Sequence, residues 1–134
     1  MIVTMKIREE KPGFGPRVDH PTILVVEDEV LVRMVIAAKC REAGYCVIES
    51  ISADEALVVL RSGANVSVVF SDVRLPGSID GIALARLIRS ELPDTKVILA
   101  SGHHPALSPA EHDGFFPKPY DADSVIACIR KLTR

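Results

Sequence analysis

The chain has 134 residues, of which 48% are hydrophobic and 25% are charged, and its net charge at pH 7 is −2. This length is typical of one domain, and the apolar content argues against a fully disordered chain. The chain has no excess of basic residues, so its charge does not indicate nucleic acid as a partner. No apolar run approaches the ~20 residues of a membrane span, and no secretory signal pattern is present. The three cysteines have no CxxC spacing, which argues against a disulfide framework or a cysteine zinc site and favours the cytoplasm.

The first 21 residues differ from the rest of the chain. They are polar, contain three prolines and two glycines, and show no sustained hydrophobic periodicity. We therefore predict a flexible leader over 1–21 and one folded domain over 22–134.

From Thr22 onward, short apolar runs alternate with helical patterns. The run 22–27 (TILVVE) is rich in β-branched residues, as a buried parallel strand should be. A helix is expected over 29–43, and Gly44 stands where a glycine would end it. Its buried side is expected to carry Val30, Met34, Val35, Ala38 and Cys40.

A second strand and helix follow. Residues 45–50 are predicted to form the strand, and 53–62 the helix. Ser52 precedes this helix, and Glu55 stands three residues later, which is a capping-box pattern. We interpret the acidic residues here as ordinary surface charges: Glu49, Asp54 and Glu55.

The second half of the chain continues the alternation. The continuous apolar run 66–71 predicts a third strand, and 80–92 an amphipathic helix that Asp80 or a neighbour opens and Pro93 ends. A fourth strand is expected over 96–101. The segment 102–113 contains two prolines and is a poor helix. A short strand at 115–119 and a last helix at 121–132 then complete the pattern.

Five strands alternating with helices predict an α/β fold. The βαβ units require a parallel sheet with helices on both faces, a doubly wound fold for which the order 2-1-3-4-5 is one of two common solutions. In such a sheet, ligands bind outside the carboxyl ends of the strands.

The polar residues of interest all fall at the carboxyl ends of predicted strands. They are Glu27, Asp28, Asp72, Ser101 and Lys118. Crowded carboxylates repel one another unless a cation intervenes, and Mg²⁺ binds one or two carboxylates while completing its shell with water and phosphate oxygens. A carboxylate can also attack phosphorus, and Lys118 and the Ser101 hydroxyl could stabilise the phosphoryl charge. The set therefore suits phosphoryl transfer onto an aspartate.

At these residues the chain resembles the receiver domains of two-component response regulators, of the stand-alone type because it ends directly after the last predicted helix. The matching segments occur in order: ILVVEDE (23–29), VVFSDVRLPGSIDG (68–81), ILASG (98–102) and FFPKPY (115–120). They are spread in order and in register over the whole of 22–134, and the resemblance implies a flavodoxin-like fold of order 2-1-3-4-5.

The resemblance implies a role for each matching residue. Asp72 would be the phosphoacceptor, with Ser101 and Lys118 binding the phosphoryl group and a cis bond preceding Pro119. Mg²⁺ would be held by four groups: Asp28, Asp72, the backbone carbonyl of Arg74 and, through water, Glu27. Ser101 and Phe115 would form the switch. No organic cofactor is implied.

The sequence departs from the family pattern at several positions. The aromatic switch residue is Phe115 rather than tyrosine, so it has no hydroxyl group. Arg74 and His103 stand two residues past Asp72 and Ser101, where they could screen the phosphoryl group from water. The loop PGSIDG is one residue longer than the common form.

The resemblance also implies partners. A sensor histidine kinase or a histidine phosphotransfer protein would supply the phosphoryl group. An unknown downstream protein would bind the face formed by the fourth helix, the fifth strand and the last helix, or the domain would act as a phosphate sink. No direct binding of nucleic acid or membrane is expected, and homodimerisation stays open.

Two other functions stay open from the sequence. One is a pseudo-receiver that serves only as an interaction scaffold, although such proteins usually lose the motif residues. The other is an aspartate-nucleophile phosphatase, in which Arg74 would occupy the position of the general acid. The leading interpretation is not an enzyme, beyond its own phosphorylation from a donor and its own dephosphorylation.

Overall fold

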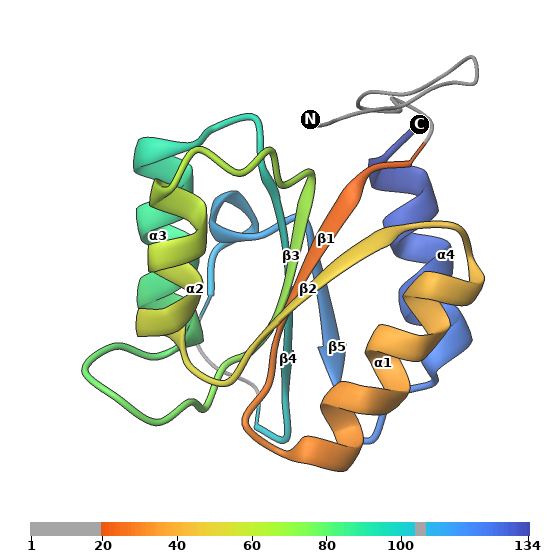
Figure 1. The fold of residues 1–134 in the computed structure, drawn as a ribbon. Helices are drawn as coiled ribbons and strands as arrows, with labels where there is room; N and C mark the ends of the chain where they lie inside the picture. The colour runs from red at the N-terminus through yellow and green to blue at the C-terminus, as the bar shows by residue number, and fades with distance from the viewer. Residues whose placement is uncertain (1–19, 104–106) are drawn as a thin grey trace.

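The computed structural model describes residues 20–103 and 107–134, in which five strands alternate with four α-helices (Figure 1). The predicted leader lies outside the described residues except for His20 and Pro21. The strands are β1 (Thr22–Val26), β2 (Cys46–Ser50), β3 (Val68–Asp72), β4 (Lys96–Ser101) and β5 (Gly114–Pro117). The helices are α1 (Val30–Glu42), α2 (Ala53–Arg61), α3 (Gly81–Glu91) and α4 (Ala122–Leu132), with a 3₁₀ turn, η1, at Pro109–Glu111.

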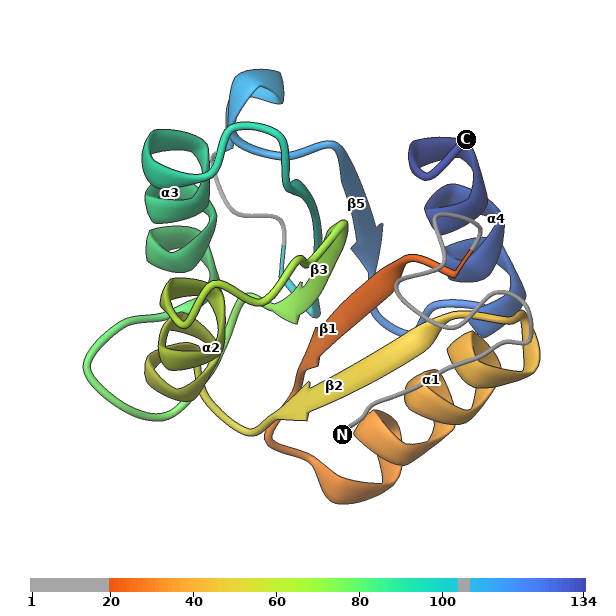
Figure 2. The ribbon, with the colours of Figure 1, turned by 45° about the horizontal axis from the view of Figure 1, so that its top comes forward.

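The strands form one parallel sheet in the order β2-β1-β3-β4-β5, which confirms the predicted doubly wound fold. Figure 2 shows α2 and α3 on one face of the sheet and α1 and α4 on the other. Successive side chains of a strand point to opposite faces. Leu24 and Val26 accordingly pack toward α2 and α3, whereas Ile23 and Val25 pack toward α1 and α4.

Helix starts follow the capping residues seen in the sequence. The Ser52 hydroxyl accepts a hydrogen bond from the Glu55 backbone N–H at 3.1 Å, and the Glu55 carboxylate accepts one from the Ile51 N–H at 3.0 Å. The Asp80 carboxylate caps α3 by accepting from the Ala83 N–H at 2.8 Å. These bonds satisfy amide donors that have no partner within the helix.

The predicted buried face of α1 is wrong except at Cys40. The buried residues are Ile36, Ala37 and Cys40, whereas Val30, Met34 and Val35 are more than half exposed. The first nine residues of α1 (VLVRMVIAA) are apolar except for Arg33 and lie on several sides of the helix, so periodicity alone cannot choose the face that meets the sheet.

The segment between β4 and β5 has little regular structure in its described part, as its prolines predict. Only η1 is helical there, and ion pairs hold its end to α3: Arg86–Glu111 at 2.7 Å and Arg89–Asp113 at 2.9 Å. None of the helices described at 20–103 and 107–134 has the length and apolar character that a membrane crossing requires.

Candidate phosphoacceptor site

Four neighbouring strands bring the candidate residues to one edge of the sheet. Asp72 is the last residue of β3 and pairs in register with Ala100, next to Ser101 at the end of β4. Ser101 in turn pairs with Pro117, next to Lys118. Glu27 and Asp28 directly follow β1, which neighbours β3. The parallel arrangement therefore gathers side chains that are up to 91 positions apart in the chain.

Three carboxylates converge at this edge. Glu27, Asp28 and Asp72 each offer an oxygen, and these oxygens lie within 4.8 Å of one another. Glu27 is 3% exposed and Asp72 is 8% exposed, whereas Asp28 is open to solvent. Hard oxygen ligands with one open side suit a divalent cation that keeps part of its water shell.

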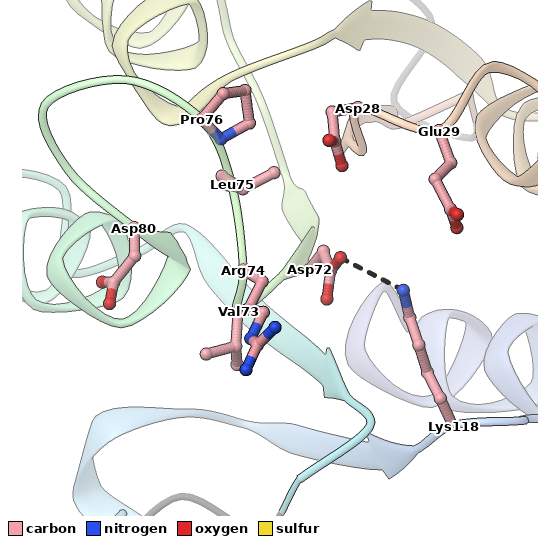
Figure 3. Close-up of a pocket in the computed structure, with 9 residues that line it drawn as sticks. All are labelled: Asp28, Glu29, Asp72, Val73, Arg74, Leu75, Pro76, Asp80 and Lys118. Carbon is pink, nitrogen blue, oxygen red and sulfur yellow. Dashed lines mark hydrogen bonds and ion pairs between the residues drawn. The ribbon is translucent and has the colours of Figure 1, made fainter.

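Lys118, which follows β5, extends toward Asp72 (Figure 3). Its Nζ lies 3.1 Å from Asp72 Oδ2 and 3.4 Å from Glu27 Oε1, so one ammonium group bridges the two least exposed carboxylates. The Lys118–Pro119 peptide is cis, as the resemblance implies.

Burial and charge act against each other at these groups. Burial raises the pKa of Glu27, and the nearby Asp72 charge adds to this, while the hydrogen bond from the Glu29 N–H and the Lys118 charge oppose it. Burial lowers the pKa of Lys118, but its hydrogen bond to Asp72 and the two carboxylate charges outweigh burial, so the net pKa is raised. Lys118 therefore stays charged over the physiological range.

Ser101 and Phe115 lie on the adjoining strands. Ser101 is buried, and its hydroxyl oxygen accepts a hydrogen bond from the His103 backbone N–H at 3.1 Å. Its own backbone carbonyl accepts from the Lys118 N–H at 2.8 Å, which ties the ends of β4 and β5. Phe115 is partly buried and packs against the core cluster beneath α2 and α3.

An open cleft gives access to the cluster. Its lining includes Asp28, Asp72 and Lys118, together with residues of the β3–α3 loop, among them Arg74, which is exposed (Figure 3). Two of the charged residues that line the cleft had no predicted role at the site. Glu29 stands directly after the acidic pair, and Asp80 was identified only as a helix cap.

Comparisons with known proteins show a family to which the chain is similar. The family model of the response regulator receiver domain matches residues 23–130. The chain is 37% identical over 117 residues to the sensor kinase CckA of Brucella abortus (strain 2308), and 35% identical over 116 residues to the C4-dicarboxylate transport transcriptional regulatory protein DctD of Rhizobium meliloti (strain 1021). Each match covers 83% of this chain, but only 12% of CckA and 25% of DctD.

Solved structures show the same fold. The response regulator protein TrrA of Thermotoga maritima, in complex with Mg(2+)-BeF, is 31% identical with a TM-score of 0.75, over 84% of this chain and 98% of TrrA. A response regulator receiver protein from Sinorhizobium medicae WSM419 is 27% identical with a TM-score of 0.76, over 87% and 97% of the two chains.

Proposed function

Since this chain belongs to the response regulator receiver domain family, we propose that it accepts a phosphoryl group on Asp72 from a phosphohistidine donor. The observation that supports this most directly is the contact between Asp72 and Lys118 at 3.1 Å, at the floor of a cleft that is open to solvent. A nucleophile there can be reached by a donor, and a fixed cation stands beside it.

In the proposed transfer, a carboxylate oxygen of Asp72 forms a bond to phosphorus while the phosphorus–nitrogen bond of the donor breaks. The bonding electrons return to the imidazole ring, which leaves neutral when its other nitrogen carries a proton. Lys118 neutralises charge on the phosphoryl oxygens, and Ser101 exchanges its bond from the His103 N–H for one to the phosphoryl group.

We assign Mg²⁺ as the metal because the donor set consists of hard oxygens. Asp28, Asp72 and the backbone carbonyl of Arg74 would hold it directly, with Glu27 acting through water. Bound Mg²⁺ would supply positive charge that offsets the charge of the transferring group. The role of Glu27 rests on its burial and on its position within 4.8 Å of the other two carboxylates.

A sensor histidine kinase or a histidine phosphotransfer protein in the cytoplasm is the proposed donor. Phosphorylation would add about −1.5 to −2 charges, by analogy with other phosphorylated side chains, and would bias the packing of Ser101 and Phe115. A downstream protein would then bind the face formed by β5, η1 and α4. Self-phosphorylation and self-dephosphorylation are the only reactions proposed.

The test is labelling with acetyl phosphate and Mg²⁺, followed by mass spectrometry. One phosphoryl group is expected, and it should be lost in Asp72→Ala and when EDTA is present. Asp94→Asn, which removes an exposed carboxylate after α3, is the control and should keep the label. Label retained by Asp72→Ala would refute the assignment. A folded protein that takes no label would favour an interaction scaffold, and repeated turnover of an aryl phosphate would favour a phosphatase.

A further inference from the structure

The loop between β3 and α3 forms one wall of the cleft. Val73, Arg74, Leu75 and Pro76 line it on this side, and Asp80 closes the loop (Figure 3). The base of the loop is anchored, because the Gly81 N–H donates to the Val73 carbonyl at 2.8 Å. The outer part of the loop makes a second contact, from Ser78 to helix α2.

Asp54 on α2 provides that contact. Its Oδ2 accepts a hydrogen bond from the Ser78 backbone N–H at 3.0 Å, and its Oδ1 accepts one from the Ser78 hydroxyl. These bonds from Ser78 also hold the pKa of the Asp54 carboxyl below its ordinary value. The interpretation of Asp54 as an ordinary surface charge is therefore wrong.

The backbone at Gly77 is shaped for this contact. Gly77 has a φ of +104°, a conformation that favours glycine, and a Cβ atom built there would collide with the Asp54 carboxylate. The loop thus approaches Asp54 more closely than a residue with a side chain would allow.

Asp54 is not required to cap its own helix. The Ser52 hydroxyl and the Glu55 carboxylate already pair with backbone amides at the start of α2. Both oxygens of Asp54 are therefore available to the loop, in a segment where the sequence carries one residue more than the common family form.

We propose that Asp54 is a positioning residue for phosphoryl transfer, which holds the outer part of the β3–α3 loop through Ser78 and thereby fixes the wall of the cleft that includes Arg74. This inference rests on the proposed function, in which the Arg74 carbonyl helps to hold Mg²⁺. Loss of the contact would let that wall move, weaken Mg²⁺ binding and change the lifetime of the phosphorylated aspartate.

The experiment compares Asp54→Ala with Glu55→Ala. Both variants remove one acidic side chain from the first turn of α2, and Glu55→Ala also removes the bond to the Ile51 N–H, so this variant controls for lost charge and for a weakened helix start. Only the first removes the bonds to Ser78. We expect Asp54→Ala to lower the ¹⁵N heteronuclear NOE of the Ser78 amide in the metal-free protein. In addition, we expect the Mg²⁺ dissociation constant, measured by amide chemical shifts, to rise about five- to tenfold, because hydrogen bonds to a charged group are lost.

Glu55→Ala should leave both quantities within about twofold of the wild type, because it keeps the bonds between Asp54 and Ser78. Asp54→Asn keeps an acceptor for the Ser78 N–H while losing the charge, and it should restore most of the Mg²⁺ affinity. If the wild type binds Mg²⁺ and takes the label, but Asp54→Ala gives the same two results as Glu55→Ala, the inference is overturned and the proposed function stands. A wild type that neither binds Mg²⁺ nor takes the label would overturn the proposed function and the inference with it.

Discussion

Gly81, the first residue of α3, lies against the backbone that carries Asp72, and Gly81→Ala tests this contact. A methyl group at position 81 would lie 2.9 Å from both the Asp72 carbonyl carbon and Val73 Cα, and it would overlap the Asp72 carbonyl oxygen. Carbon atoms in contact prefer separations of about 3.5–4.0 Å, so that the helix and the strand end must separate by roughly 1 Å.

The sign of the stability change follows from two opposing effects. Alanine in place of glycine within a helix ordinarily stabilises by about 1 kcal/mol. Overpacking costs about 1–3 kcal/mol, and the atoms met here are backbone atoms that cannot rotate away. The upper half of that range, about 2–3 kcal/mol, exceeds the gain from alanine, so we expect Gly81→Ala to lower the free energy of unfolding by about 1–2 kcal/mol. Because the shift moves Asp72 itself, labelling by acetyl phosphate should slow by about 10- to 100-fold.

Urea unfolding followed by far-UV circular dichroism measures the first effect, and the rate of labelling measures the second. Gly102→Ala is the control for the stability measurement, since a Cβ atom there would meet nothing within 4 Å and its φ does not lie between +20° and +160°. The control should change stability by less than about 0.5 kcal/mol. A Gly81→Ala protein that equals or exceeds the wild type in stability would show that the contact is not tight.

Three further predictions concern the surroundings of the site. Lys118→Met leaves the buried Glu27 carboxylate without its cation, so the free energy of unfolding in EDTA should fall by about 2 kcal/mol. This loss is smaller than for a fully buried pair, because Lys118 is 26% exposed. Unchanged urea unfolding would contradict this prediction. Burial raises the pKa of Tyr120 to about 12, so the Tyr120 hydroxyl keeps its proton in the folded state at a pH at which the unfolded chain has lost it. The free energy of unfolding should therefore fall as the pH rises from about 10 to 12. Tyr120→Phe should reduce that fall, which thermal unfolding across this pH range measures. Gly77→Ala should raise the Mg²⁺ dissociation constant as Asp54→Ala does, because the new methyl group displaces the carboxylate; an unchanged chemical-shift titration would contradict it.

The fold and the carboxylate cluster could be predicted because each depends on a pattern that is local in the chain. Continuous apolar runs identified the strands, and the parallel arrangement then required their carboxyl ends to meet. Glu27, Asp28, Asp72 and Lys118 each stand at such an end, so their convergence needed no knowledge of side-chain packing.

The missed features depend on contacts between segments that carry no pattern. The exposed face of α1 could not be chosen because the helix is apolar on several sides, and the sheet decides which residues it covers. The bond between Asp54 and Ser78 joins a helix to a loop 24 positions away, and an acidic residue near a helix start is ordinarily explained by the helix itself.

The placement of the three cysteines makes selective chemistry possible without engineering. Cys46 is exposed at the start of β2, Cys40 is buried with its pKa raised to about 11, and burial also raises the pKa of Cys128. Because the thiolate is the reactive form, a maleimide dye at neutral pH should attach at Cys46 first. Position 46 begins a five-residue strand, and its far end at Ser50, about 13 Å away at the usual rise per residue, lies beside Glu27 of the acidic cluster. A fluorophore there would report the slower tumbling of a complex, in a chain that has no tryptophan, while leaving the cleft untouched.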